Sequence, residues 1–270
     1  MRSRVTPATD FPPALLARVE DAGLNASAPP QQRWMDGWLV RFSPGKAKRA
    51  RCINAVAPGV RLLADKLAAS AALYQAQSLP WIFRITPFTQ PADLDAQLAA
   101  RGFVAEDDTR VMVCTDLAQA IAQAAAAPQP AVDMSWREID PADYGPIVGA
   151  WRGTPPEGVR AHVERLRTTP VPYRAWIGCD ATGELLAGGQ TATEDGLVGL
   201  YDIFTAPAAR GQGLATALCG ALLAAAREGG AEAAYLQVDA DNLAARRIYQ
   251  RLGFADAYAY HYRTDTHAGG

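Results

Sequence analysis

Residues 200–215 combine a strand-like run, a glycine-rich turn and a helix-like run, and together these could hold an anion. The turn reads Arg210-Gly211-Gln212-Gly213, and its two glycines let backbone N–H groups converge with no Cβ in the way. These donors would lie at a helix N-terminus, where unpaired N–H groups and the helix dipole favour negative charge. Because the turn lacks both Gly-Lys-Ser/Thr and Gly-x-Gly-x-x-Gly, it is neither a Walker loop nor a dinucleotide fingerprint. It predicts a diphosphate site, and a glycine-rich turn that binds nothing is the alternative.

Residues 242–254 carry a second set of side chains at helical spacing. Asn242, Ala245 and Tyr249 are separated by three and then four positions, which places them on one helix face. Asn242 can cap that helix, Ala245 leaves room for a ligand, and Tyr249 presents a hydroxyl that can donate a proton. An ordinary half-buried aromatic residue is the alternative for Tyr249.

The two segments resemble the GNAT superfamily of acyl-CoA-dependent N-acetyltransferases. Residues 210–215 fit its pattern Gln/Arg-x-x-Gly-x-Gly/Ala, and residues 242–254 fit its Asn–Ala–Tyr helix. The resemblance covers residues 134–263 and extends more weakly over 34–117, as in proteins with two GNAT units in tandem. It implies that the turn holds the CoA pyrophosphate, that the strand edge pairs with the pantetheine amides, and that the tyrosine protonates the leaving thiolate. The implied acetyl-CoA contacts are Phe204, Thr205, Arg210, Gly211, Gln212, Gly213, Leu214, Ala215, Asn242, Ala245 and Tyr249.

The activity that the resemblance implies is transfer of an acetyl group from acetyl-CoA to a primary amine, by direct attack in a ternary complex. The acceptor stays open among small amines, amino acids, antibiotics and peptide N-termini, and no metal is implied. Two alternatives remain: a non-catalytic acyl-CoA sensor or regulatory module, and a tandem relative that transfers another acyl group. Tyr249 favours the enzyme, because a protein that only binds acyl-CoA needs no acid at that position.

A base, or an ordered water chain leading to one, must take a proton from the attacking amine. Asp202, three residues before Thr205, is our candidate, because relatives often carry an acidic residue on this strand. A structural carboxylate is the alternative, and Glu194 and Asp195 are weaker candidates nearby. A backbone N–H near Thr205 would polarise the thioester carbonyl.

Several residues outside these segments are candidates for the acceptor pocket or for the surface. Trp151 and Arg152 end the first helix of the second half, where family members line the acceptor pocket. His162, among arginine and glutamate residues on a predicted helix, is expected on the surface. The basic run 46–51 is expected to be a solvated hairpin rather than a polyanion site.

The first half of the chain repeats the order of strands and helices of the second half but lacks the residues that we assign to binding and catalysis. Segments 56–61 and 205–210 resemble each other, as do 101–103 and 252–254, at nearly equal spacing. The first copy has no glycine turn, and Leu98 stands at the position of the helix tyrosine. We therefore expect a degenerate GNAT-like copy that shapes the active cleft or supports the sheet.

Strands alternate with helices in both halves, which predicts a mixed α/β sheet of the α+β type, in two GNAT-like domains. Pro128 and Pro130 end a helical run, so the predicted domains are 1–128, degenerate, and 129–270, catalytic. Strands are expected at 38–42, 51–56, 81–86, 109–115, 173–179, 184–192, 196–205, 235–238 and 254–262. Helices are expected at 61–77, 91–101, after Asp140, and at 158–167, 213–228 and 242–252.

The composition excludes several classes of protein. The 270 residues are 49% hydrophobic and 20% charged, as in a globular chain. A net charge of −2 gives little electrostatic drive toward nucleic acid or a membrane surface. We see no apolar run typical of a signal peptide or a membrane span, so we expect a cytoplasmic protein. The abundance of arginine and alanine indicates a bacterial source. The sequence does not indicate an oligomeric state. The cysteines form no Cys-x-x-Cys pair and are expected to be reduced: Cys52, Cys114, Cys179 and Cys219.

Overall fold

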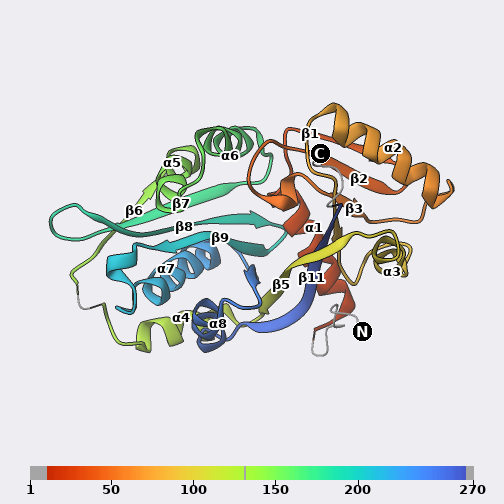
Figure 1. Ribbon diagram of the computed structural model, residues 1–270. Helices are drawn as coiled ribbons and strands as arrows, with labels where there is room; N and C mark the ends of the chain where they lie inside the picture. The colour runs from red at the N-terminus through yellow and green to blue at the C-terminus, as the bar shows by residue number, and fades with distance from the viewer. Residues whose placement is uncertain (1–10, 131, 266–270) are drawn as a thin grey trace.

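The computed structural model describes residues 11–130 and 132–265, whose strands form one continuous sheet (Figure 1). Its eleven strands follow the order β1-β2-β3-β4-β11-β5-β10-β9-β8-β7-β6. They are β1 Gln31–Met35, β2 Trp38–Phe42, β3 Ile53–Ala55, β4 Ile82–Ile85, β5 Val104–Cys114, β6 Ser135–Ile139, β7 Tyr173–Cys179, β8 Leu185–Glu194, β9 Leu197–Thr205, β10 Ala233–Asp239 and β11 Ala255–Thr264. Parallel and antiparallel pairs both occur, which confirms the predicted mixed α/β sheet.

Helices cover both faces of the sheet, because successive side chains of a strand point to opposite faces. On β8, Gly188 faces Tyr144 of α5, whereas Gly189 faces Leu218 of α7. In Figure 1, α5 and α6 accordingly lie on one side of the strands and α7 on the other. The helices are α1 Pro13–Ala26, α2 Leu63–Ala76, α3 Leu94–Ala99, α4 Leu117–Ala126, α5 Pro141–Trp151, α6 Pro156–Thr168, α7 Leu214–Glu228 and α8 Leu243–Arg251, with short 3-10 turns at Lys48–Ala50 and Pro207–Ala209.

The two halves of the chain exchange their last strands. β3 runs parallel to β4, and β9 runs parallel to β10, so each half has the same strand–helix–strand–helix–strand order. The final strand of each half pairs with the other half: β11 lies beside β4, and β5 lies beside β10. β5 and β11 also pair with each other. The repeated order supports an internal duplication, and the division into domains 1–128 and 129–270 stays a proposal.

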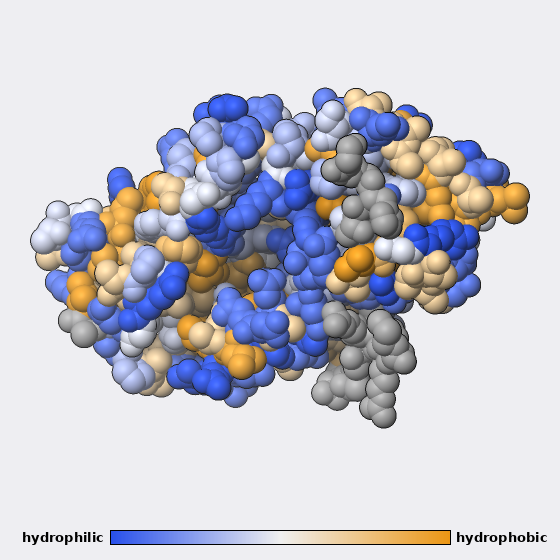
Figure 2. All heavy atoms as spheres, viewed as in Figure 1, coloured by the Kyte–Doolittle hydropathy of each residue, from blue (hydrophilic) through white to orange (hydrophobic). Residues whose placement is uncertain are grey.

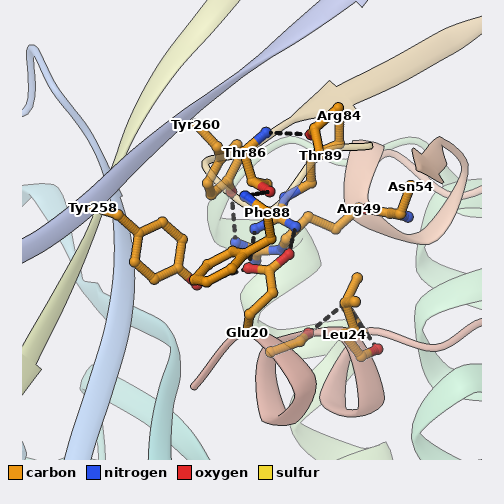
Figure 3. Close-up of polar contacts among 12 residues, drawn as sticks. Glu20, Leu24, Arg49, Asn54, Arg84, Thr86, Phe88, Thr89, Tyr258 and Tyr260 are labelled. Atoms are coloured by element: carbon orange, nitrogen blue, oxygen red, sulfur yellow. Dashed lines mark hydrogen bonds and ion pairs between the residues drawn. The ribbon is translucent and has the colours of Figure 1, made fainter. Parts of the chain in front are cut away.

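A buried polar cluster joins the exchanged strand to the first half. Glu20 of α1 forms an ion pair with Arg84 of β4 and accepts a hydrogen bond from the Tyr258 hydroxyl of β11 at 2.7 Å (Figure 3). The Arg84 guanidinium also lies 4.0 Å from the centroid of the Tyr260 ring. Burial opposes ionisation of Glu20, but the charge and hydrogen bonds of Arg84 outweigh it and lower the pKa of the carboxyl. The cluster thus ties together three elements that are distant in sequence.

Most predicted elements occur within a few residues of their expected bounds. The predicted helix 213–228 is α7, and its Leu214, Leu218 and Leu222 are buried. Three elements, α1, β1 and β6, were not predicted from the sequence. α1 begins after Pro12 without a side-chain cap, and β1 and β6 are largely exposed edge strands, so the usual signals are weak.

Membrane-spanning helices and disulfides are both absent from the residues that the structure describes. Within residues 11–130 and 132–265, no helix combines the length and apolarity needed to cross a membrane. The four cysteines are free, and all are buried except the partly exposed Cys179.

Candidate active site

The glycine-rich turn lies at the N-terminus of α7 and presents backbone donors. Gly211 and Gly213 have φ angles of 77° and 84°, which residues with a Cβ adopt only with strain. Gly213 is the N-cap of α7, and no side-chain hydrogen bond caps the helix. The first N–H groups of α7 therefore lack the side-chain acceptor that often satisfies one of them, and the helix dipole adds positive potential. This geometry fits an anion such as a diphosphate.

The two glycines have different surroundings. A Cβ at Gly211 would meet no atom within 4 Å, whereas a Cβ at Gly213 would lie 3.2 Å from the Pro128 carbonyl oxygen. The linker therefore packs against Gly213, and the open side of the turn is at Gly211. Arg210 is exposed beside it, with Nε 3.4 Å from the Thr205 carbonyl oxygen. The turn thus combines open space, backbone donors and the exposed cation of Arg210.

β9 and β10 separate beside this turn. They pair over Leu197–Leu200 and Ala233–Leu236, and within the described chain no pairing between them continues as β9 runs on to Thr205. The β9 backbone over 201–205 is therefore open toward β10. Figure 2 shows the surface hollowed at the centre of the view, between the regions that Figure 1 labels α6 and α8. An open strand edge of this kind can hydrogen-bond an extended ligand that contains amide groups.

A bulge in β9 sets the position of Asp202. The register between β8 and β9 shifts there, because Gln190 faces Tyr201 while Gly188 faces Phe204. Asp202 has a φ of 51°, in the left-handed region that non-glycine residues rarely occupy. The Tyr144 hydroxyl donates a hydrogen bond of 2.8 Å to the Asp202 carbonyl oxygen, which stabilises this backbone geometry. Strain of this kind is frequent at functional sites.

Three donors surround the Asp202 carboxylate. Arg152 forms an ion pair with Oδ1, and Gln190 Nε2 donates to Oδ2 at 2.7 Å. His162 Nε2 lies 3.3 Å from the same oxygen. Burial opposes ionisation, but the His162 hydrogen bond and the Arg152 charge outweigh it and hold the pKa of Asp202 well below its usual range. A carboxylate stabilised in this way is a weak base and keeps its negative charge.

His162 is not the surface residue that the sequence suggested. Its Nδ1 lies 3.3 Å from Arg165 Nη2, and a guanidinium can only donate, so we assign Nδ1 as the acceptor. With Nδ1 as the acceptor, Nε2 carries the proton that is directed at Asp202. Asp202 lies forty positions further along the chain, so no local pattern could have revealed this contact.

The predicted Asn–Ala–Tyr helix is α8. The Asn242 side-chain oxygen accepts a hydrogen bond from the Ala245 N–H at 3.2 Å, which confirms the cap. Tyr249 is 9% exposed, and its hydroxyl makes no hydrogen bond with any residue that the structure describes. Burial, with a smaller contribution from the Cys219 thiol, raises the pKa of this phenol. Tyr249 therefore stays protonated at neutral pH and can donate to a ligand.

The remaining candidate residues lie at the two ends of β9. Trp151 stacks on Phe204 with ring centroids 5.0 Å apart, beside the open edge of β9. Glu194 accepts a hydrogen bond from Asn25 Nδ2 at 2.9 Å, at the end of β9 away from Thr205, so it is not brought to the site. Asp195 lies in the same turn. Within the described ranges, no group of three His, Cys, Asp or Glu side chains could hold a metal ion.

A separated pair of parallel strands, with a glycine turn opening the helix after the first strand, can bind an extended ligand that carries an anion. Residues 135–254 match the family described as acetyltransferase (GNAT) family. This segment, which is less than half of the chain, is therefore similar to that family.

Relatives of known sequence or structure agree with this assignment. Over 233 residues the chain is 28% identical to the uncharacterized N-acetyltransferase YobR of Bacillus subtilis strain 168, covering 86% of this chain and 91% of YobR. A GCN5-related N-acetyltransferase from Kribbella flavida has a TM-score of 0.67 at 19% identity, covering 94% of this chain and 96% of that one. A tandem GNAT protein from the clavulanic acid biosynthesis pathway has a TM-score of 0.58 at 18% identity, covering 77% and 70%. At these identities the two solved structures show the fold alone.

Proposed function

We propose that the protein is an N-acetyltransferase that moves an acetyl group from acetyl-CoA to a primary amine of a small molecule or peptide. The observation that carries the proposal is the open cradle at Gly211 beside the unpaired edge of β9. The unbonded hydroxyl of Tyr249 adds a proton donor that simple binding would not need. The similarity of residues 135–254 to a family that generally uses acetyl-CoA supports the same proposal.

Acetyl-CoA would be held mainly by backbone. N–H groups of residues 211–215 would bind the pyrophosphate, with the exposed guanidinium of Arg210 adding positive charge. The open edge at Phe204 and Thr205 would pair with the pantetheine amides. The remaining proposed contacts would border this path: Gln212, Gly213, Leu214, Ala215, Asn242, Ala245 and Tyr249.

The reaction forms an N–C bond as the thioester C–S bond breaks, so the amine loses a proton and the thiolate gains one. Tyr249 would donate to the thiolate, and because its pKa is raised, this donation acts chiefly as a stabilising hydrogen bond. The permanently charged Asp202 would attract the acceptor as its ammonium ion. Since Asp202 is a weak base, we propose that the proton passes to water rather than remaining on this carboxylate.

Residues 1–128 would form the degenerate GNAT-like domain, and 129–270 the catalytic one. α2 begins at Leu63 behind Leu62, without a glycine cradle, and Leu98 is buried where α8 presents its tyrosine. We therefore expect one acetyl-CoA site per chain.

Release of free thiol from acetyl-CoA, measured against a panel of amines, tests the function. Turnover with at least one amine, and one site per chain by calorimetry, are the expected results. Tight acetyl-CoA binding without turnover of any amine would favour the sensor. Faster thiol release from a longer acyl-CoA would instead indicate transfer of another acyl group.

A further inference from the structure

A cavity of about 220 Å³ reaches Asp202 and is lined by both halves of the chain. α5 and α6 supply Arg152, His162 and Arg165, and the loop after β2 supplies Lys46 and Arg49. The basic run expected to be a solvated hairpin thus contributes two cations to an internal surface. The cavity is where an acceptor could reach Asp202 under the proposed function.

Arg49 reaches this cavity without a carboxylate partner. Its guanidinium contacts the side-chain oxygen of Gln237 and the Tyr260 hydroxyl, the latter at 3.2 Å (Figure 3). It also lies 5.9 Å from the centroid of the Tyr201 ring. No ion pair links Arg49 to any acid in the described residues. Its positive charge is therefore balanced only by neutral groups.

Arg165 of α6 also lines the cavity without a carboxylate partner among the described residues. It is 9% exposed, and its Nη1 donates to the Ala26 carbonyl oxygen at 2.6 Å and to the Tyr173 hydroxyl at 3.2 Å. Its Nη2 approaches His162, and within the described chain it also has no carboxylate partner. A buried cation without a counter-charge is costly, so such groups are usually paired.

Most other buried cations among the described residues follow that rule, and Arg41 is the exception. Arg84 pairs with Glu20, and Arg263 pairs with Asp95. Arg41 lacks a carboxylate, but four hydrogen bonds occupy its guanidinium and burial lowers its pKa to about 10. Arg41 does not line the cavity.

The cavity therefore has a strong excess of positive charge. Lys46 is exposed at its edge and makes no ion pair with any described residue, and the single carboxylate, Asp202, already pairs with Arg152. In a cavity partly shielded from water, this excess attracts an anion far more than the net charge of the chain suggests.

We infer that the acceptor is a small amine that also carries an anionic group, a carboxylate or a phosphate. Its ammonium end would face Asp202, and its anionic end would face Arg49, Arg165 and Lys46. This inference rests on the proposed function and names the substrate class of that same site. Because the two ends have opposite charge, the cavity would also fix the direction in which the acceptor enters.

The first test compares acceptors that share an amine and differ in one charge. β-Alanine is paired with β-alaninamide, and phosphoethanolamine with ethanolamine, with thiol release from acetyl-CoA as the readout. We expect kcat/KM, corrected for the neutral-amine fraction, to be roughly 10–100-fold higher for the charged member of one pair. The pair that responds tells carboxylate from phosphate. Equal or higher values for both neutral members would overturn the inference and leave the proposed function standing.

The second test uses variants of the full chain. Lys46→Gln at an exposed position, and Arg165→Gln, should each lower the charged-to-neutral ratio of kcat/KM about tenfold. Arg167→Gln, exposed on the same helix and outside the cavity, should leave the ratio unchanged. An unchanged ratio in Lys46→Gln and Arg165→Gln, or weaker acetyl-CoA binding in Lys46→Gln, would overturn the inference.

Calorimetry separates the two proposals if no amine turns over. Binding of β-alanine or phosphoethanolamine to the CoA-loaded protein, weakened at least tenfold by Lys46→Gln, would support the anionic ligand while the transferase proposal fails. No binding of either charged probe would overturn the inference.

Discussion

Replacing Gly211 with aspartate should weaken acetyl-CoA binding without unfolding the protein. A Cβ at Gly211 meets no atom within 4 Å, so the only cost to folding is the left-handed backbone, about 1–2 kcal/mol. A carboxylate about 4 Å from a phosphate charge costs about 4 kcal/mol at an effective dielectric constant near 20. Solvent screening at this exposed turn reduces the penalty to about 2–3 kcal/mol, or roughly a 30–150-fold higher Kd.

A second glycine supplies the matched control. Gly183 has a φ of 88°, and a Cβ there also meets nothing within 4 Å, but it lies in the turn between β7 and β8. Gly183→Asp should therefore lower the melting temperature as much as Gly211→Asp and leave the acetyl-CoA Kd unchanged. Gly211→Ala separates crowding from charge. Gly213 is less suitable, because its Cβ would press on the Pro128 carbonyl.

The assay is isothermal calorimetry with acetyl-CoA, together with thermal unfolding of each variant. If Gly211→Asp and Gly183→Asp bind acetyl-CoA within about twofold of each other, the cradle at Gly211 does not hold the diphosphate.

Three further perturbations test the chemistry and the fold. Tyr249→Phe should lower kcat by roughly 100-fold and leave the acetyl-CoA Kd unchanged. The effect is at the low end for a general acid because the pKa of the Tyr249 phenol is raised. An unaltered kcat in steady-state kinetics would show that the phenol takes no part in the mechanism. Because the pKa of Asp202 is lowered, its carboxylate stays ionised above about pH 5, so the acid limb of kcat/KM should follow the pKa of the acceptor amine. A limb fixed across several amines would mean that a protein group titrates. Glu20→Gln leaves a buried arginine without its partner and should cost about 3–5 kcal/mol in urea unfolding, against little for Asp21→Asn at the exposed neighbouring position. The contribution of Glu20 is present above the unfolded pKa of 4.5 and lost as pH falls through the lower folded value, so the difference between wild type and Glu20→Gln should shrink in acid.

Features that depend on a few neighbouring residues could be predicted from sequence alone. The glycine turn and the uncapped start of α7 follow from local backbone freedom and helix geometry, and Asn242 caps α8 where its spacing indicated. The buried leucine face of α7 follows from helical periodicity. Elements with weak local signals were not predicted, because α1 has no side-chain cap and the edge strands β1 and β6 bury few side chains.

The arrangement around Asp202 could not be predicted in the same way. The strand position was expected, but Arg152, Gln190 and His162 come from three other elements, and their combined donors turn the expected base into a stabilised carboxylate. A pKa depends on every charge and dipole nearby, and those neighbours are set by packing rather than by sequence spacing.

The sequence by itself determined the glycine-rich turn, the capped tyrosine helix and the repeated order of elements, because each depends on a short stretch of chain. Only the tertiary structure decided that β11 pairs with β4 and β5 with β10, since backbone hydrogen bonds are chemically alike in every strand and do not specify a partner. The exchange makes the two halves share one sheet. It accompanies a cavity that is lined by Lys46 and Arg49 from the first half and by Asp202 from the second.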